Sequence, residues 1–265
     1  MTTPVVAGAG RLGGKNAIVS GGTRGIGAAI ARELLAQGAR VTVLGRNPDS
    51  IEKALAAFVE AGEMAHVSAD VADSQAVGKA FAAARERFGA IHILVNSAGQ
   101  ASSAPFLKTD AELWQRMMSV NLLGTVHCMR ASLPGMLEAG WGRIVNIAST
   151  AGLVGYAYVS AYCAAKHALI GLTRAVALEV ATKSVTVNAV CPGFTETGML
   201  EATVANIVAK TGRTAELARS ELAARNPQAR LVQPAEVANV VSWLCLSGSE
   251  SITGQAIAVA GGEVM

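Results

Sequence analysis

Short apolar runs rich in β-branched residues alternate along the chain with longer segments that have helical periodicity. The runs lack polar alternation, which is typical of parallel strands covered by helices on both faces. Seven strands alternating with helices predict an α/β fold with a doubly wound parallel sheet. The expected helical segments are 25–38, 50–62, 74–89, 110–137 and 160–181. The expected strands are NAIVS (16–20), RVTVL (40–44), AHVSA (65–69), IHILVN (91–96), RIVNIA (143–148), SVTVNAV (184–190) and AIAVA (256–260).

Residues 197–233 interrupt this alternation, because two helical pieces occur there without a strand between them. The insertion follows a strand end, where open α/β sheets bind their ligands, and this position favours a substrate lid. A helical hairpin that completes the core is the alternative. We therefore expect a flexible tail at 1–13 and a single domain at 14–265 that includes the lid.

The composition excludes several classes of protein. With 265 residues, 51% hydrophobic and 15% charged, the chain can bury one large core. A net charge of +3 with scattered basic residues and few aromatic residues disfavours nucleic-acid binding. The first residues have no basic flank followed by an apolar core, and the uncharged interval 144–165 contains many polar side chains. We expect a cytoplasmic protein without a secretory signal or membrane span.

The cysteines and histidines do not form a metal-binding pattern. Four cysteines are far apart, and four histidines are isolated from one another. No CxxC pair or Cys/His ligand spacing is present, so reduced core cysteines and no metal site are expected.

A glycine-rich turn follows the first expected strand. Gly21, Gly25 and Gly27 lie in SGGTRGIGAAIA, between that strand and a helix. Glycine allows positive φ and lets a pyrophosphate approach the first amides of the helix. The context favours dinucleotide binding over a turn that is merely tight.

The end of the second strand bears on which dinucleotide is bound. NAD sites usually place an acidic residue there, whereas VTVLGRN has Gly45 followed by Arg46. A guanidinium without the carboxylate favours a 2′-phosphate, and Arg24 in the glycine turn adds a second positive charge. We therefore expect NADP(H); the alternative is that both arginines are solvated surface charges.

A tyrosine and a lysine four residues apart form the strongest candidate for catalysis. Tyr162 and Lys166 share one helix face in SAYCAAKHAL. A phenol has a pKa of about 10, so a nearby cation is needed to make it useful in acid–base chemistry at neutral pH. Ser149 lies just past the carboxyl end of RIVNIA, at the sheet edge where Gly21 and Asn96 also emerge, and the fold brings these residues together.

The ordered set of motifs resembles the classical short-chain dehydrogenase/reductase family from about Lys15 to Gly262. This resemblance implies a Rossmann-type sheet and an NAD(P)-dependent oxidoreductase. The set departs from the usual NNAG at Ser97. The matching motifs are the glycine turn, ADV with Asp70, NSAG at 96–99, Asn121 in SVNLLG, Ser149, YxxxK at Tyr162 and Lys166, and CPGFTET at 191–197.

The resemblance implies a role for each catalytic residue. Ser149 binds the substrate carbonyl, Tyr162 donates the proton, and Lys166 binds the nicotinamide ribose and lowers the phenol pKa. Asn121 holds a water that connects Lys166 to solvent, unless it is an ordinary buried amide. The resemblance also implies that Asp70 and Val71 hold the adenine ring and that residues 192–197 hold the nicotinamide. The cofactor-binding residues expected from the glycine turn and the resemblance are Gly21, Thr23, Arg24, Gly25, Ile26, Gly27, Arg46, Asp70, Val71, Asn96, Ser97, Ala98, Gly99, Tyr162, Lys166, Pro192, Gly193, Thr195 and Thr197.

The expected substrate walls are mostly apolar, which suits a hydrophobic or aryl-bearing ketone. The lid carries a surplus of basic residues that suits an acyl-carrier phosphate or, alternatively, a solvated amphipathic helix. The expected substrate residues are Ser149, Leu153, Tyr156, Phe194 and Met199.

Three hypotheses about function follow. The leading one is an NADP-dependent reductase of a 3-oxoacyl thioester or similar ketone, because the motifs look most like 3-oxoacyl and polyketide ketoreductases and 3-hydroxybutyrate dehydrogenases. The second is a catabolic NAD-dependent 3-hydroxyacid or secondary-alcohol dehydrogenase, and the third is a dinucleotide sensor without catalysis. The resemblance also implies a homotetramer or homodimer formed through the helices around 111–138 and 158–181 and the C-terminal strand.

Overall fold

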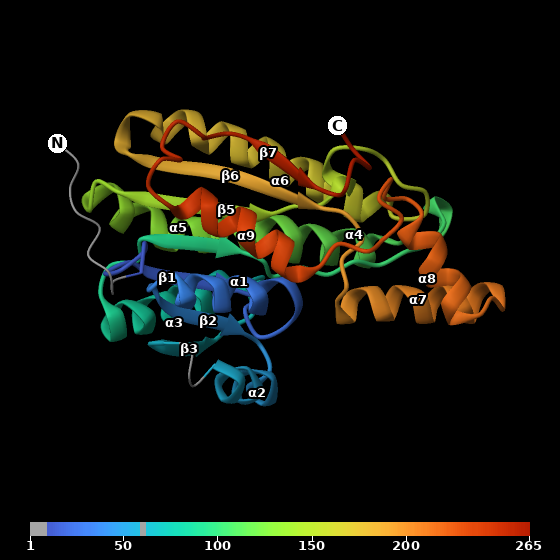
Figure 1. Ribbon diagram of the computed structural model, residues 1–265, viewed down its shortest axis with the longest axis horizontal. Helices are drawn as coiled ribbons and strands as arrows, with labels where there is room; N and C mark the ends of the chain where they lie inside the picture. Colours follow the sequence, from blue (N-terminus) through green and yellow to red (C-terminus); the bar gives the residue numbers. More distant parts are fainter. Residues whose placement is uncertain (1–9, 59–61) are drawn as a thin grey trace.

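A seven-stranded parallel sheet forms the centre of the molecule (Figure 1). The computed structural model describes residues 10–58 and 62–265. The strand order is β3-β2-β1-β4-β5-β6-β7, and each neighbouring pair is parallel. The strands are β1 (Asn16–Ser20), β2 (Arg40–Gly45), β3 (Met64–Ser68), β4 (Ile93–Asn96), β5 (Gly142–Ile147), β6 (Val185–Pro192) and β7 (Ala256–Val259). The predicted α/β class and its strands are confirmed.

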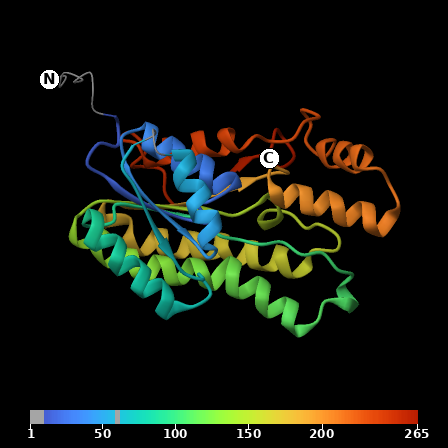
Figure 2. The ribbon, with the colours of Figure 1, turned by 90° about the horizontal axis from the view of Figure 1, so that it is seen from below.

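Helices cover both faces of the sheet (Figure 2). On one face α1 and α9 pack together, with Leu34 and Val237 in one buried cluster. On the other face α3, α5 and α6 enclose a second cluster that contains Phe81 and Met129. The helices are α1 (Gly25–Ala36), α2 (Pro48–Phe58), α3 (Ser74–Phe88), α4 (Ala111–Met118), α5 (Gly124–Glu138), α6 (Ser160–Val180), α7 (Gly198–Thr211), α8 (Ala215–Ala223) and α9 (Pro234–Cys245).

Burial on both faces explains why the strand runs are mostly apolar. Every residue of β1, β5 and β6 is buried. Fully burying one side chain such as Leu34 or Phe81 contributes about 1.5–3 kcal/mol. The sheet is therefore a rigid support for the segments that follow its strands.

The long helix predicted over 110–137 is interrupted. A π-helical turn at Ser119–Leu123 separates α4 from α5 and contains Asn121. A π turn inserts one extra residue per turn and widens the helix, which periodicity over a long window does not reveal. The interruption therefore contains Asn121, which the sequence predicts to be a catalytic residue.

The predicted flexible tail differs from the structure where the structure describes it. Residues 1–9 of that tail lie outside the described residues. Leu12 is 2% exposed and belongs to the core cluster of α1 and α9, and its amide donates to the Gln37 carbonyl at 2.7 Å. Leu12 therefore anchors this segment to the domain, because its apolar side chain completes the core, whereas residues 10, 11 and 13 are exposed.

The two helical pieces predicted after the sixth strand are confirmed as α7 and α8. They extend outward from the edge of the sheet at which β6 ends (Figures 1 and 2). Among the described helices, none combines the length and the apolar character needed to cross a bilayer.

Candidate active site

Segments that follow parallel strands meet at one edge of the sheet. Ser20 at the end of β1 is in register with Asn96 of β4, and Asn96 is in register with Asn146 of β5. The glycine turn, residues 97–99 and Ser149 follow these strand ends closely. The strand order reverses between β1 and β4, which is where such sheets form a ligand-binding crevice.

The glycine turn after β1 has the geometry that a pyrophosphate needs. Gly21 has φ of 67°, and a Cβ there would lie 2.9 Å from the backbone of Ala98. A Cβ on Gly27 would lie 2.2 Å from the Gly21 carbonyl oxygen. The turn therefore requires glycine at both positions, and α1 begins at Gly25 with its amide end toward the crevice. These residues fit a bound dinucleotide.

The adenosine ribose is expected to bind near Gly45, at the end of β2. Thr23 occupies the space beside Gly45 into which an acidic side chain at that position would extend. A Cβ on Gly45 would lie 2.9 Å from Thr23 Cγ2. The Arg46 side chain is 62% exposed, and its Nη1 lies 3.3 Å from Asp70 Oδ2. Arg24 is exposed at the N-cap of α1. The structure thus places Arg46 beside Asp70, so one predicted phosphate ligand pairs with one predicted adenine ligand.

The side chains of Ser149 and Tyr162 are neighbours in the crevice. Ser149 precedes a short 3-10 turn at Thr150–Gly152 and accepts a hydrogen bond from the Ala151 amide at 3.1 Å. Burial raises the pKa of Tyr162 to about 12, and the neighbouring Ser149 side chain opposes that rise. The phenol is therefore protonated at neutral pH and can act as a proton donor.

Lys166 lies deeper in the same crevice. It is 4% exposed, its Nζ donates to the Ile147 carbonyl at 2.8 Å, and Nζ lies 5.7 Å from the centroid of the Tyr162 ring. Burial lowers the pKa of Lys166 to about 8. Burial raises the phenol pKa in this structure, and the lowering of that pKa by Lys166 stays a prediction.

Asn121 is a buried amide with partners on both of its polar atoms. Its Nδ2 donates to the carbonyl groups of Gln100 at 2.9 Å and Met117 at 3.0 Å, and its Oδ1 accepts from the Gln100 amide at 3.2 Å. A Cβ on Gly99 would lie 2.9 Å from Asn121 Oδ1 and 3.7 Å from Lys166 Nζ. The side chain thus stabilises the π turn beside Lys166, and its role in a water relay stays a prediction.

The segment after β6 links the far side of the crevice to the glycine turn. Thr195 Oγ1 donates to the Gly193 carbonyl at 2.9 Å, and Thr197 Oγ1 donates to the Thr195 carbonyl at 3.3 Å. A Cβ on Gly25 would lie 3.3 Å from Thr197 Cγ2. The predicted pyrophosphate and nicotinamide ends of the cofactor site are therefore neighbours.

Two aromatic side chains form one wall of the predicted substrate site. Tyr156 and Phe194 meet edge to face, with ring centroids 6.4 Å apart. Leu153 is half-buried after Ser149, whereas Met199 on the first turn of α7 is 45% exposed. The structure therefore brings Tyr156 and Phe194 together and leaves Met199 outside this contact.

Helix α7 is joined to the loop after β4. Asn206 Nδ2 on α7 donates to Ser103 Oγ at 2.9 Å. The Ala104 amide donates to the Tyr158 carbonyl at 2.8 Å. Three segments from different parts of the chain are thus tied together over the crevice.

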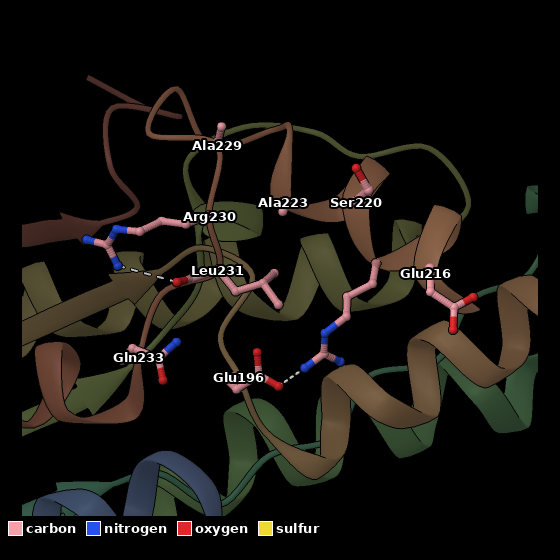
Figure 3. A pocket seen from close by; sticks show the side chains of 9 residues that line it. Glu196, Glu216, Ser220, Ala223, Ala229, Arg230, Leu231 and Gln233 are labelled. Atoms are coloured by element: carbon pink, nitrogen blue, oxygen red, sulfur yellow. Dashed lines mark hydrogen bonds and ion pairs between the residues drawn. The ribbon is translucent and has the colours of Figure 1, made fainter. Parts of the chain in front are cut away.

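A cavity of about 530 Å³ lies between α8 and the chain that precedes α9 (Figure 3). Arg219 pairs there with Glu196 and Glu201. Arg213 and Arg230 also have carboxylate partners. Since these arginines are paired, the geometry favours the solvated amphipathic helix over the phosphate-binding surface, the other alternative. The lining residues are Glu196, Glu216, Arg219, Ser220, Ala223, Ala229, Arg230, Leu231 and Gln233.

Two polar residues that support the site were missed from the sequence. Ser20 Oγ accepts from the amides of Ser97 at 3.1 Å and Ala98 at 3.2 Å, and Asn146 Oδ1 accepts from Asn96 Nδ2 at 2.8 Å. Both stand in otherwise apolar strand runs, and a buried polar residue near a strand's carboxyl end was the available signal.

Comparisons with known proteins agree with this geometry. Residues 15–207 match the family model described as short chain dehydrogenase. The chain is 40% identical to "Putative ketoacyl reductase" of Streptomyces coelicolor, over 93% of this chain and 95% of that protein. It is 37% identical to "D-beta-hydroxybutyrate dehydrogenase" of Rhizobium meliloti, over 94% of this chain and 98% of that protein.

Solved structures show the same likeness. The crystal structure of a variant of actinorhodin polyketide ketoreductase with NADPH superimposes with a TM-score of 0.91 and 38% identity, over 94% of this chain and 97% of that chain. The crystal structure of levodione reductase gives a TM-score of 0.90 at 29% identity, over 95% of this chain and 98% of that chain.

Proposed function

The chain belongs to the short-chain dehydrogenase/reductase family, and we propose that it reduces a ketone to a secondary alcohol with NADPH. Membership makes it an oxidoreductase of alcohols and carbonyls that uses a nicotinamide dinucleotide. The proposed substrate is a 3-oxoacyl thioester or a similar hydrophobic or aryl ketone. The proposal rests on the Tyr162 phenol, which lies beside Ser149, with Nζ of the buried Lys166 5.7 Å from the centroid of its ring.

Each part of the site has its own role in the proposed reaction. The bound dinucleotide supplies a hydride from its nicotinamide ring. Ser149 and Tyr162 bind the carbonyl oxygen, and Tyr162 donates its proton as negative charge develops there. Lys166 stays within reach of the ring of Tyr162 and is placed to bind ribose hydroxyls. The glycine turn and the segment at 192–197 hold the two ends of the cofactor.

The adenosine corner supports the phosphorylated dinucleotide. Thr23 occupies the space beside Gly45 where an acidic side chain would start. Arg24 and Arg46 are both exposed next to this corner. A 2′-phosphate can accept charge-assisted hydrogen bonds from both guanidinium groups.

A second candidate function is oxidation of a 3-hydroxyacid or secondary alcohol with NAD. The 37% identity to a D-beta-hydroxybutyrate dehydrogenase over 94% of this chain favours it. The absence of an acidic residue at the end of β2 favours the NADPH proposal instead. The two functions differ in dinucleotide preference and can be separated by that property.

The experiment measures reduction of ethyl acetoacetate and 1-tetralone with NADPH and with NADH. We expect a higher kcat/KM with NADPH, and we expect Tyr162→Phe to lose about 100-fold or more in kcat because the proton donor is gone. Tyr158→Phe is the matched control, since Tyr158 is exposed. A preference for NADH would overturn the cofactor proposal, and full activity in Tyr162→Phe would overturn Tyr162 as the proton donor. Dinucleotide binding without turnover of either ketone by the wild type would favour a dinucleotide sensor.

A further inference from the structure

The hydroxyl of Tyr156 is held between two side chains at the wall of the site. It lies 2.6 Å from Glu263 Oε1 and 2.9 Å from Thr150 Oγ1. Because a carboxylate only accepts hydrogen bonds, the phenol donates to Glu263 and the Thr150 hydroxyl donates to the phenol. Burial raises the pKa of Tyr156 to about 12, and the hydrogen bond to Glu263 adds to that rise. Tyr156 therefore stays protonated and keeps this bond at neutral pH.

Packing holds the Tyr156 ring as well as its hydroxyl. The ring meets Phe194 edge to face at an interplanar angle of 75°. The guanidinium carbon of Arg225 lies 5.4 Å from the centre of the same ring. Both arrangements are attractive for an aromatic ring, so a shift of Tyr156 would disturb each of them.

A tight turn after β7 places Glu263 at this wall. The Glu263 amide donates to the Ala260 carbonyl at 3.1 Å across Gly261 and Gly262, whose φ angles are 60° and 95°. Positive φ at two successive central residues is the pattern of type I′ turns and suits glycine. A Cβ on Gly261 would lie 2.0 Å from Asn226 Oδ1, which belongs to a buried side chain. The backbone therefore determines where the carboxylate lies.

The carboxylate also contacts the segment predicted to hold the nicotinamide. A Cβ on Gly193 would lie 2.8 Å from Glu263 Oε2, so glycine there leaves room for the second carboxylate oxygen. One oxygen thus faces Tyr156 and the other faces Gly193. Glu263 connects the loop after Ser149 to the segment after β6 on the substrate side of the crevice.

We propose that Glu263 is a positioning residue for substrate specificity, which holds the Tyr156 ring as a fixed wall against Phe194 for a bulky ketone. This role rests on the proposed ketone reductase function. Glu263 acts through Tyr156 and does not touch the reacting atoms. A ketone large enough to contact the wall depends on it, and a small ketone does not.

The test compares Glu263→Ala, Glu263→Gln, Tyr156→Phe and the double variant Tyr156→Phe/Glu263→Ala in the full chain. KM and kcat are measured with NADPH for 1-tetralone as the bulky probe and acetone as the small one. Glu86→Gln on α3 is the matched control, because Glu86 is an exposed glutamate remote from the wall. Thermal unfolding midpoints show whether each variant is folded.

We expect Glu263→Ala to raise the KM for 1-tetralone about tenfold, the equivalent of one hydrogen bond between a charged group and a phenol. The kcat, the KM for NADPH and the KM for acetone should stay within about twofold of wild type. Glu263→Gln should recover part of the loss, because its amide oxygen still accepts from the phenol. The double variant should be no worse than Glu263→Ala alone, because both changes remove the same bond.

The outcomes separate this proposal from the proposed function. If the wild type reduces neither ketone, the proposed function fails and the role of Glu263 fails with it. If the wild type is active and Glu263→Ala has an unchanged KM for 1-tetralone, only the role of Glu263 is overturned. An equal rise in KM for both ketones and for NADPH would also overturn the role of Glu263. Additive effects of the two changes in the double variant would overturn it as well.

Discussion

At the scale of single residues, Lys166 is a buried cation whose main bond is to a backbone carbonyl oxygen. Burial lowers its pKa to about 8 from an ordinary value of 10.5. Between these two pH values the unfolded chain binds more protons than the native one, so this group makes stability rise with pH across that window. Below pH 8 the native state carries the full cost of the buried charge.

Lys166→Met should therefore stabilise the fold while it abolishes ketone reduction. The free energy of unfolding at pH 7 should increase by about 2 kcal/mol, after allowance for the lost hydrogen bond to Ile147. The gain should shrink as the pH rises from 8 toward 10. Chemical denaturation between pH 6 and pH 10 measures it.

The control for this prediction is Lys79→Met, since Lys79 is exposed on α3. Its effect on stability should not depend on pH in this way. A constant gain for Lys166→Met from pH 6 to pH 10 would contradict the assignment of the lowered pKa to burial.

At the scale of elements, the loop after β4, the loop before α6 and helix α7 form the rim of the crevice. The loop after β4 contacts α7 through Ser103 and Asn206, and it contacts the loop before α6 through Ala104 and Tyr158. The structure thus contains the contacts that a lid at 197–233 requires. They also fit a hairpin that completes the core, and kinetics can distinguish the two.

Asn206→Ala should loosen α7 over the site and raise the KM for 1-tetralone about fivefold, because a hydrogen bond contributes about 1 kcal/mol. The kcat should change less, because Asn206 lies outside the catalytic group. Thr203→Ala on the same helix is the control, since its hydroxyl donates only to the Met199 carbonyl within α7. An unchanged KM in Asn206→Ala would assign α7 and α8 to the core hairpin.

At the scale of the whole molecule, the outer helices keep apolar side chains on their surfaces. Leu137 on α5, Leu178 on α6 and Trp243 on α9 are 40%, 81% and 46% exposed. Contiguous exposed apolar patches mark interfaces, whereas single exposed apolar residues are common on any surface. Leu137 and Leu178 lie on the two helices through which the homotetramer or homodimer is predicted, and the assembly stays a prediction.

Leu178→Asp should reduce the molar mass of the assembly in solution, because a charge would be buried at the α6 interface. Size-exclusion chromatography with light scattering measures the change. Leu107→Asp is the control, since Leu107 is 95% exposed in the loop after β4. A monomeric wild type would contradict the predicted assembly.

The sequence by itself determined the sheet and the order of the residues on its edge. Runs such as NAIVS and RIVNIA are mostly apolar without polar alternation, which is typical of strands with helices on both faces. Parallel strands present their carboxyl ends at one edge, so Gly21, Asn96 and Ser149 had to converge. Spacing of four residues likewise placed Tyr162 and Lys166 on one helix face.

Tertiary structure alone decided the electrostatics and the long-range partners. The pKa of Tyr162 and that of Lys166 depend on burial, which the identity of neighbouring residues in the chain does not give. The π turn at Asn121 and the contact between Tyr156 and Glu263 depend on packing between segments far apart in the sequence. Local patterns predict elements and their edges, whereas desolvation and contacts across the fold arise only when those elements are packed together.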